Sequence, residues 1–152
     1  MARILIVGCG CRGQELARAL VAGGHAVRGT TRDQARFAAI AATGAEPVLA
    51  DPDRMGTLVR ALDAVAVVVW LLGQVSDPAL QGPRLRALLE RLVDTTVRGF
   101  AFEAPHDGVR DAARHARETW EIPVAEITAG NWPDSALSAL ARLLASNTHK
   151  SR

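Results

Sequence analysis

The chain has 152 residues, of which 49% are hydrophobic and 22% are charged. These values are typical of one globular domain and exclude collagen-like, low-complexity and disordered chains. The net charge of +2 comes from 18 basic and 16 acidic residues that are interleaved along the chain, and only 4% of the residues are aromatic. A nucleic-acid-binding surface would need clustered basic residues with aromatic residues among them, so we expect no nucleic-acid partner.

The sequence also predicts a compartment. The longest apolar run, residues 64–73, is about half as long as a membrane-spanning helix, and the first residues do not form a targeting signal. The two cysteines are too few and too close together for a secreted disulfide framework. We expect one cytoplasmic domain over residues 1–146, a polar tail over residues 147–152, and no membrane partner.

The first elements in chain order are a strand, a glycine-rich turn and a helix. Residues 3–7 form an almost continuous β-branched run, which predicts a strand buried on both faces. Residues 14–22 carry leucine and alanine at helical spacing, and Gly23-Gly24 marks the expected end of that helix. A second strand is predicted over residues 26–31.

The rest of the chain repeats this alternation. We expect further strands over residues 46–49, 65–72, 97–102 and 124–128, and helices over residues 32–42, 55–62, 85–92, 109–120 and 136–144. This pattern predicts an α/β three-layer Rossmann fold, in which a parallel sheet of order 3-2-1-4-5-6 has helices on both faces. The ligand of such a sheet binds at the carboxyl ends of the strands, beside the first strand, where the order reverses.

The most informative motif is Gly8-Cys9-Gly10-Cys11-Arg12-Gly13, between the first strand and the first helix. This G-x-G-x-x-G spacing, in this setting, is typical of dinucleotide-binding proteins. Gly8 would make the tight turn, Gly10 would let the backbone approach a pyrophosphate, and Gly13 would let the helix pack against the strand. Free amides and the helix dipole would then attract the phosphates. The alternative is a glycine turn that binds no ligand.

The end of the second strand indicates which dinucleotide is expected. NAD sites place an acidic residue there, whereas this chain has Thr30-Thr31-Arg32-Asp33. Arg32 can pair with a 2′-phosphate, and the hydroxyl of Thr30 or Thr31 can add a contact, so the segment favours NADP. NAD is the alternative, because a shift of one residue would put Asp33 in the acidic position. A solvated Arg32 without a ligand is also an open alternative.

Two later strand ends supply further cofactor candidates. Asp51 follows the third strand and can contact the adenine amino group, or it can serve only as a helix N-cap. Leu71-Leu72-Gly73 ends the fourth strand, where a small residue lets the backbone pass the nicotinamide half of the cofactor.

Cys9 and Cys11 lie within the glycine motif. Two thiols without further cysteines cannot complete a tetrahedral metal site, and neighbours at this spacing rarely form a disulfide. We therefore interpret them as small residues that suit a cofactor loop and expect no metal. Redox sensing is the alternative, because a helix N-terminus lowers the pKa of a thiol.

The stretch from Arg3 to Asp33 resembles the NAD(P)-dependent epimerase/dehydratase branch of the short-chain dehydrogenase/reductase family. Downstream, Pro123-Val124 and Gly130-Asn131-Trp132-Pro133 are similar to that family's sixth strand and to the segment that leads into its substrate pocket. The resemblance implies a Rossmann domain that binds NADP or NAD, and it places Asn131 and Trp132 near a substrate.

The chain departs from that family at the catalytic positions. The family uses a tyrosine, a lysine that follows it on a helix, and a serine or threonine at the end of the fifth strand. This chain has no tyrosine, its only lysine is Lys150, and its fifth strand ends at Glu103. Family-like spacing puts the tyrosine and lysine positions at His106 and Arg110, which would share one helix face. A histidine is a competent general acid near neutral pH, so His106, Arg110 and Glu103 are the catalytic candidates. The alternative is that His106 only begins a helix.

Two functions follow from these residues. The first is an NADP-dependent oxidoreductase or epimerase-like enzyme that acts on a small molecule of unknown identity. The second is a non-catalytic, NADP-sensing or regulatory module, which the missing tyrosine and the lack of a substrate domain favour. A homodimer formed through an apolar helix face is a third, weaker hypothesis.

Overall fold

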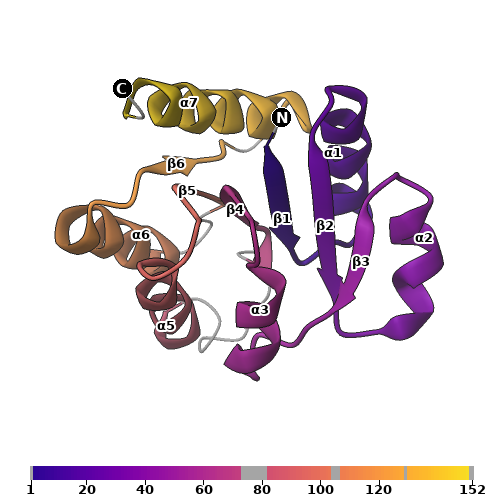
Figure 1. Ribbon diagram of the computed structural model, residues 1–152, viewed down its shortest axis with the longest axis horizontal. Helices are drawn as coiled ribbons and strands as arrows, with labels where there is room; N and C mark the ends of the chain where they lie inside the picture. Colours follow the sequence, from indigo (N-terminus) through magenta and orange to yellow (C-terminus); the bar gives the residue numbers. More distant parts are fainter. Residues whose placement is uncertain (1, 73–81, 104–106, 129, 151–152) are drawn as a thin grey trace.

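Six strands form one parallel sheet in the part of the chain that the structure describes (Figure 1). This computed structural model describes residues 2–72, 82–103, 107–128 and 130–150, with only the backbone described for residues 146–150. The strands are β1 (Arg3–Val7), β2 (Ala26–Thr31), β3 (Glu46–Leu49), β4 (Val67–Trp70), β5 (Gly99–Phe102) and β6 (Val124–Glu126). Their order is β3-β2-β1-β4-β5-β6, and all neighbouring pairs are parallel. The predicted order 3-2-1-4-5-6 is therefore confirmed.

Helices cover both faces of the sheet because the strands are apolar on both faces. One face carries α1 (Cys11–Ala22), α2 (Phe37–Ala41) and α7 (Asp134–Lys150), and the other carries α3 (Met55–Ala61), α5 (Pro83–Leu92) and α6 (Asp107–Trp120) (Figure 1). Within β1, Ile4 and Ile6 join the core beneath α1, whereas Leu5 and Val7 join the opposite core, because successive strand side chains alternate. The predicted three-layer Rossmann architecture is confirmed.

The segment after β2 differs from the prediction of one helix over residues 32–42. It forms η1 (Gln34–Arg36), a turn of 3-10 helix, followed by the short α2. The carboxylate of Asp33 accepts a hydrogen bond from the N–H of Ala35 at 2.9 Å and so begins the turn at Asp33. Arg32 and Asp33 consequently lie outside the helices, at the carboxyl edge of the sheet.

Several other boundaries differ from the predicted ones, the largest differences being in β4 and α7. β4 begins at Val67 and not at residue 65, because Ala64 has a positive φ of 58° and the N–H of Val65 is used in a turn with the carbonyl of Leu62. α7 continues to Lys150, beyond the predicted end at residue 144.

The topology places the end of β1 at the centre of the carboxyl edge. β1 pairs with β2 on one side and with β4 on the other, so the connections from these strands leave the sheet in opposite directions. A crevice forms at such a reversal in open α/β sheets.

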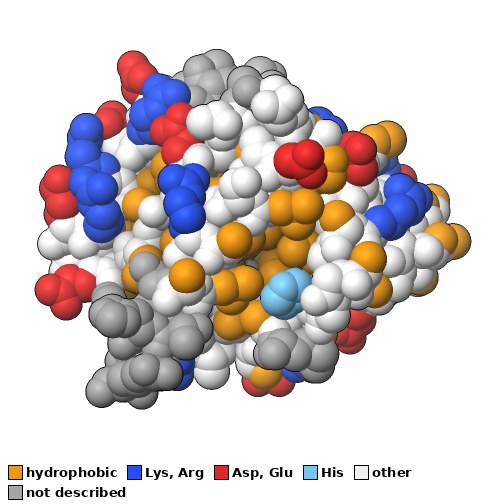
Figure 2. All heavy atoms as spheres, turned by 90° about the horizontal axis from the view of Figure 1, so that it is seen from above, with side chains coloured by type: hydrophobic (Ala, Val, Ile, Leu, Met, Phe, Trp, Pro, Cys, Tyr) orange, Lys and Arg blue, Asp and Glu red, His pale blue; other side chains and the backbone are white. Residues whose placement is uncertain are grey.

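The surface that faces the viewer in Figure 2 is the side seen from above in Figure 1. Apolar side chains gather near its centre, and charged side chains of both signs lie around them. Neither sign of charge dominates this face. No helix among the described residues is both long enough and apolar enough to cross a membrane.

Candidate functional site

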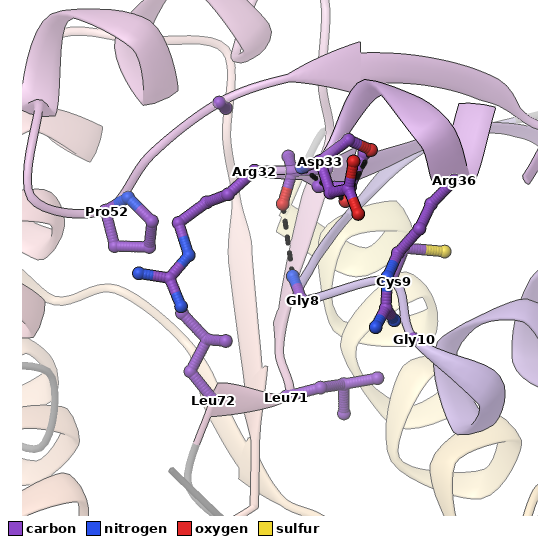
Figure 3. A pocket seen from close by; sticks show the side chains of 12 residues that line it. Gly8, Cys9, Gly10, Arg32, Asp33, Arg36, Pro52, Leu71 and Leu72 are labelled. Carbon is purple, nitrogen blue, oxygen red and sulfur yellow. Dashed lines mark hydrogen bonds between the residues drawn. The ribbon is translucent and has the colours of Figure 1, made fainter. Parts of the chain in front are cut away.

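A pocket of about 480 Å³ lies at the reversal point of the sheet (Figure 3). Its walls come from the segments that follow β1, β2, β3 and β4. The lining residues are Gly8, Cys9, Gly10, Thr30, Thr31, Arg32, Asp33, Arg36, Ala50, Pro52, Leu71 and Leu72. Most of the cofactor-binding residues predicted from the sequence are thus brought together in one cavity.

Thr30 holds the glycine loop against β2. Its hydroxyl accepts a hydrogen bond from the N–H of Gly8 at 3.1 Å, drawn as a dashed line in Figure 3, and its carbonyl accepts one from the N–H of Cys9 at 2.9 Å. Thr30 is only 3% exposed. The hydroxyl predicted as a ligand contact therefore also has a structural partner, the N–H of Gly8 in the glycine loop.

The glycines of the motif meet different requirements. Gly8 has a positive φ of 90°, and a Cβ there would lie 2.7 Å from Cδ2 of Leu72. A Cβ on Gly13 would lie within 3.3 Å of atoms of Gly8, Cys9 and Ile6, so this glycine permits close packing of α1 on β1. A Cβ on Gly10 would meet only the guanidinium of Arg36, at 3.9 Å. Gly10 therefore leaves open space at the pocket, where a bound group can approach the backbone.

The first turn of α1 presents unused donors. The N–H of Gln14 donates to the carbonyl of Gly10, but no acceptor among the described residues binds the N–H of Cys11 or Arg12. No side chain caps this helix and its first turn has no acidic residue. Unpaired amides at the positive end of a 12-residue helix attract an anion such as a pyrophosphate.

Arg32 and Asp33 lie at the rim of the pocket, and of their two side chains only that of Asp33 has a partner among the described residues. Arg32 extends from the end of β2 toward Pro52 and Leu72 (Figure 3), and its guanidinium has no hydrogen-bond or ion-pair partner among the described residues. The carboxylate of Asp33 caps the start of η1 by accepting a hydrogen bond from the N–H of Ala35. The main-chain N–H of Asp33 donates to the hydroxyl of Thr31 at 3.1 Å. One oxygen of the acidic group that would favour NAD is thus engaged within the turn.

Arg36 is a lining residue that the sequence reasoning missed. Its side chain reaches from η1 toward Gly10, on the side of the pocket opposite Arg32 (Figure 3). It too has no partner for its guanidinium among the described residues. The sequence does show a second arginine four positions after Arg32. Because one continuous helix was predicted over residues 32–42, this arginine was not expected to reach the pocket.

The later strand ends contribute apolar walls. Ala50 and Pro52 line the pocket, whereas Asp51 between them does not, and its carboxylate accepts a hydrogen bond from the N–H of Asp53 at 2.9 Å. Helix α3 begins only at Met55, so the alternative role of Asp51 as a helix N-cap is wrong. Leu71 and Leu72 line the opposite side of the pocket, and Gly73 lies outside the described residues.

The two cysteines are in different environments. Cys9 is 2% exposed, and its side chain packs against Gly29 of β2. The packing is so close that a Cβ added to Gly29 would lie only 2.7 Å from the Sγ of Cys9. Burial raises the pKa of the Cys9 thiol from 9.0 to about 11, which keeps it protonated and unreactive near neutral pH. Cys11 is exposed, and neither forms a disulfide. Cys9 thus contributes its backbone to the pocket and its side chain to the core.

Arg12 does not line the pocket but lies beside it, in a cluster with two distant residues. Its guanidinium binds both carboxylate oxygens of Glu103, the first at 2.8 Å, and lies 4.1 Å from the centre of the Trp132 ring. The indole N–H of Trp132 donates to the carbonyl of Arg12 at 3.0 Å. We call Arg12, Glu103 and Trp132 the Arg12 cluster.

The predicted catalytic and substrate residues are divided among several places in the part of the chain that the structure describes, and only Glu103 and Trp132 share one, the Arg12 cluster. Arg110 binds Glu126, with the closest N–O distance 2.8 Å, whereas Glu103 binds Arg12. Asn131 lines a separate hollow of about 250 Å³ beside the start of α7. His106 lies outside the described residues. The pocket at the glycine loop, with two unpaired guanidiniums and the free amides of α1 beside it, is therefore separate from most of the catalytic and substrate candidates.

No protein-family model matches the chain, and no curated protein matches it by sequence. Solved structures match it by fold. UDP-glucuronic acid 4-epimerase from Bacillus cereus, in complex with NAD, is similar with a TM-score of 0.65 and 14% identity over 82% of this chain and 54% of its own.

Two reductases are similar to the same extent. Triphenylmethane reductase from Citrobacter sp., complexed with NADP(H), has a TM-score of 0.67 and 19% identity over 82% of this chain and 48% of its own. Vestitone reductase from alfalfa (Medicago sativa L.) has a TM-score of 0.66 and 14% identity over 83% of this chain and 56% of its own. The chain spans about half the length of these structures. At the level of the fold, these likenesses confirm the resemblance seen in the sequence: the chain has the Rossmann fold of these epimerases and reductases.

Proposed function

We propose that the chain binds NADP(H) in this pocket and acts as a small oxidoreductase or epimerase-like enzyme. The observation that carries the proposal is the pair of guanidiniums, Arg32 and Arg36, that flank the pocket without an acidic partner among the described residues. Two unpaired arginines beside a glycine loop match the charge of a 2′-phosphate better than the neutral ribose hydroxyl of NAD.

Each part of the pocket suits one part of the ligand. The apolar walls at Ala50 and Pro52 would accept the adenine, and the free amides at the start of α1 would hold the pyrophosphate. Arg32 and Arg36 would approach the 2′-phosphate from opposite sides of the pocket. When bound, the nicotinamide supplies hydride transfer. The NAD and NADP(H) in the complexes of the epimerase and of triphenylmethane reductase support a nicotinamide dinucleotide as the ligand class.

Catalysis in this proposal does not use the tyrosine and lysine of the related enzymes, which the chain lacks at usable positions. His106 is the proposed proton donor. Glu103 and Arg110 each have a different ion-pair partner, so we do not assign them a shared catalytic role. Asn131 and Trp132 are the proposed contacts of a small-molecule substrate. The free cysteines agree with the proposed cytoplasmic location.

Calorimetric titration with NADPH, NADP and NAD tests the binding step. We expect NADP and NADPH to bind more tightly than NAD, and the absence of heat with all three at millimolar concentration would reject the proposal. Oxidation of NADPH with a panel of carbonyl, quinone and flavin acceptors tests catalysis. Turnover that is lost in His106→Ala supports the enzyme, whereas binding without turnover of any acceptor supports the sensing module instead.

A further inference from the structure

The Arg12 cluster joins three segments that are distant in the sequence. Arg12 belongs to the first turn of α1, Glu103 follows β5, and Trp132 precedes α7. Arg12 is 91 residues from Glu103 and 120 residues from Trp132 along the chain. The start of α1 is thus attached to the other half of the sheet.

Arg12 is held firmly in this cluster. Glu103 is 5% exposed, and among the described residues Arg12 is the only partner of its carboxylate. Moving the guanidinium away would leave a buried negative charge without compensation, which is strongly unfavourable. Arg12 therefore stays with Glu103 and is not free to leave the cluster for a ligand phosphate.

The cluster acts on the first turn of α1, where it adds to the main-chain hydrogen bonds of Gly10. Gly10 precedes α1 without a side-chain cap, and the first turn carries the unused amides of Cys11 and Arg12. The Arg12 side chain makes an ion pair with the Glu103 carboxylate and a cation–π contact with the Trp132 ring. The main-chain carbonyl of Arg12 accepts a hydrogen bond from the indole N–H of Trp132. Together they fix where these amides point.

We propose that Glu103 and Trp132 are positioning residues for the phosphate-binding turn, acting through Arg12. This inference rests on the proposed binding of a dinucleotide. Because the Arg12–Glu103 pair is neutral as a unit and lies outside the pocket lining, its effect is on amide geometry and not on the charge that selects NADP. The cluster therefore sets the affinity for the pyrophosphate that NAD and NADP share, and leaves the choice between them to Arg32 and Arg36.

The test compares Glu103→Asp, which keeps the charge of the pair but shortens its reach, and Trp132→Leu with the wild type, using NADP, NAD and adenosine 2′-monophosphate as ligands in calorimetry. Both dinucleotides should bind about five- to tenfold more weakly, as expected for the loss of roughly one well-aligned hydrogen bond. The ratio of the NADP and NAD affinities should stay constant, and adenosine 2′-monophosphate, which has no pyrophosphate, should bind as before.

Two further variants separate positioning from general damage. Trp132→Phe keeps a ring over the guanidinium but loses the N–H donor, so it should retain more affinity than Trp132→Leu. Trp120→Phe, at the end of α6, is the matched control and should behave as the wild type. Urea unfolding of each variant shows which samples are folded before ligand is added.

Three results would overturn the inference: unchanged dinucleotide affinity in Glu103→Asp and Trp132→Leu, a changed NADP-to-NAD ratio, or an equal loss for adenosine 2′-monophosphate. A wild-type chain that binds neither dinucleotide would instead reject the proposed function itself. The two failures are therefore distinguishable.

Discussion

Replacing Arg36 by methionine should weaken NADP binding selectively. The substitution keeps the length of the side chain and removes its charge, next to the open space at Gly10. A phosphate monoester carries up to about two negative charges near neutral pH. An exposed pair of unit charges about 4 Å apart is worth about 1 kcal/mol in water, and salt reduces this value. The loss of one exposed guanidinium should therefore cost about 1–2 kcal/mol, or about five- to thirtyfold in the Kd for NADP.

Calorimetry with NADP and NAD at low and high salt is the assay for Arg36→Met. The Kd for NAD should change by less than about twofold, and the loss for NADP should shrink as salt screens the charges. Arg86→Met is the matched control, because Arg86 is an exposed arginine on α5 outside this pocket. An equal loss for NAD and NADP would refute the reasoning, because it would place Arg36 at the pyrophosphate and not at the 2′-phosphate.

The glycine loop supports further predictions. Gly10→Ala should change the free energy of unfolding by less than about 1 kcal/mol, because φ is −82° there, but should weaken dinucleotide binding more than about tenfold by filling the approach to the backbone. Gly8→Ala should destabilise the fold by about 1–3 kcal/mol in urea unfolding, through its positive φ and the contact with Leu72. In thiol labelling near neutral pH, Cys11 should react and Cys9 should not, and labelling of both without denaturant would contradict the burial of Cys9. Because folding raises the pKa of Cys9 from 9.0 to about 11, its contribution to stability is complete below pH 9, and up to about 3 kcal/mol of it should be lost as pH rises through 11.

The elements that the sequence predicted well are those whose signal is local. The β-branched run of β1 and the leucine stripe of α5 reflect burial at the periods of a strand and a helix. The glycine motif between β1 and α1 could be placed at the reversal of the sheet because crossover rules leave few possible strand orders. Local signal was weaker after β2, where the Asp33 carboxylate accepts a hydrogen bond from the N–H of Ala35, so that the helix predicted from residue 32 begins only at Gln34, as η1 followed by α2.

The sequence by itself therefore determined the α/β class, the strand order and the place of the glycine loop, because these depend on periodicity and on turn chemistry between neighbours. Only the tertiary structure decided what the side chains at that place do. In the tertiary structure Arg36 lines the pocket, and the Thr30 hydroxyl accepts a hydrogen bond from the glycine loop. Arg12 binds Glu103 and contacts the Trp132 ring. These partners lie about a hundred residues apart in the chain and are brought together by burial and charge in the folded protein. A local sequence pattern therefore cannot predict which distant group compensates a buried charge.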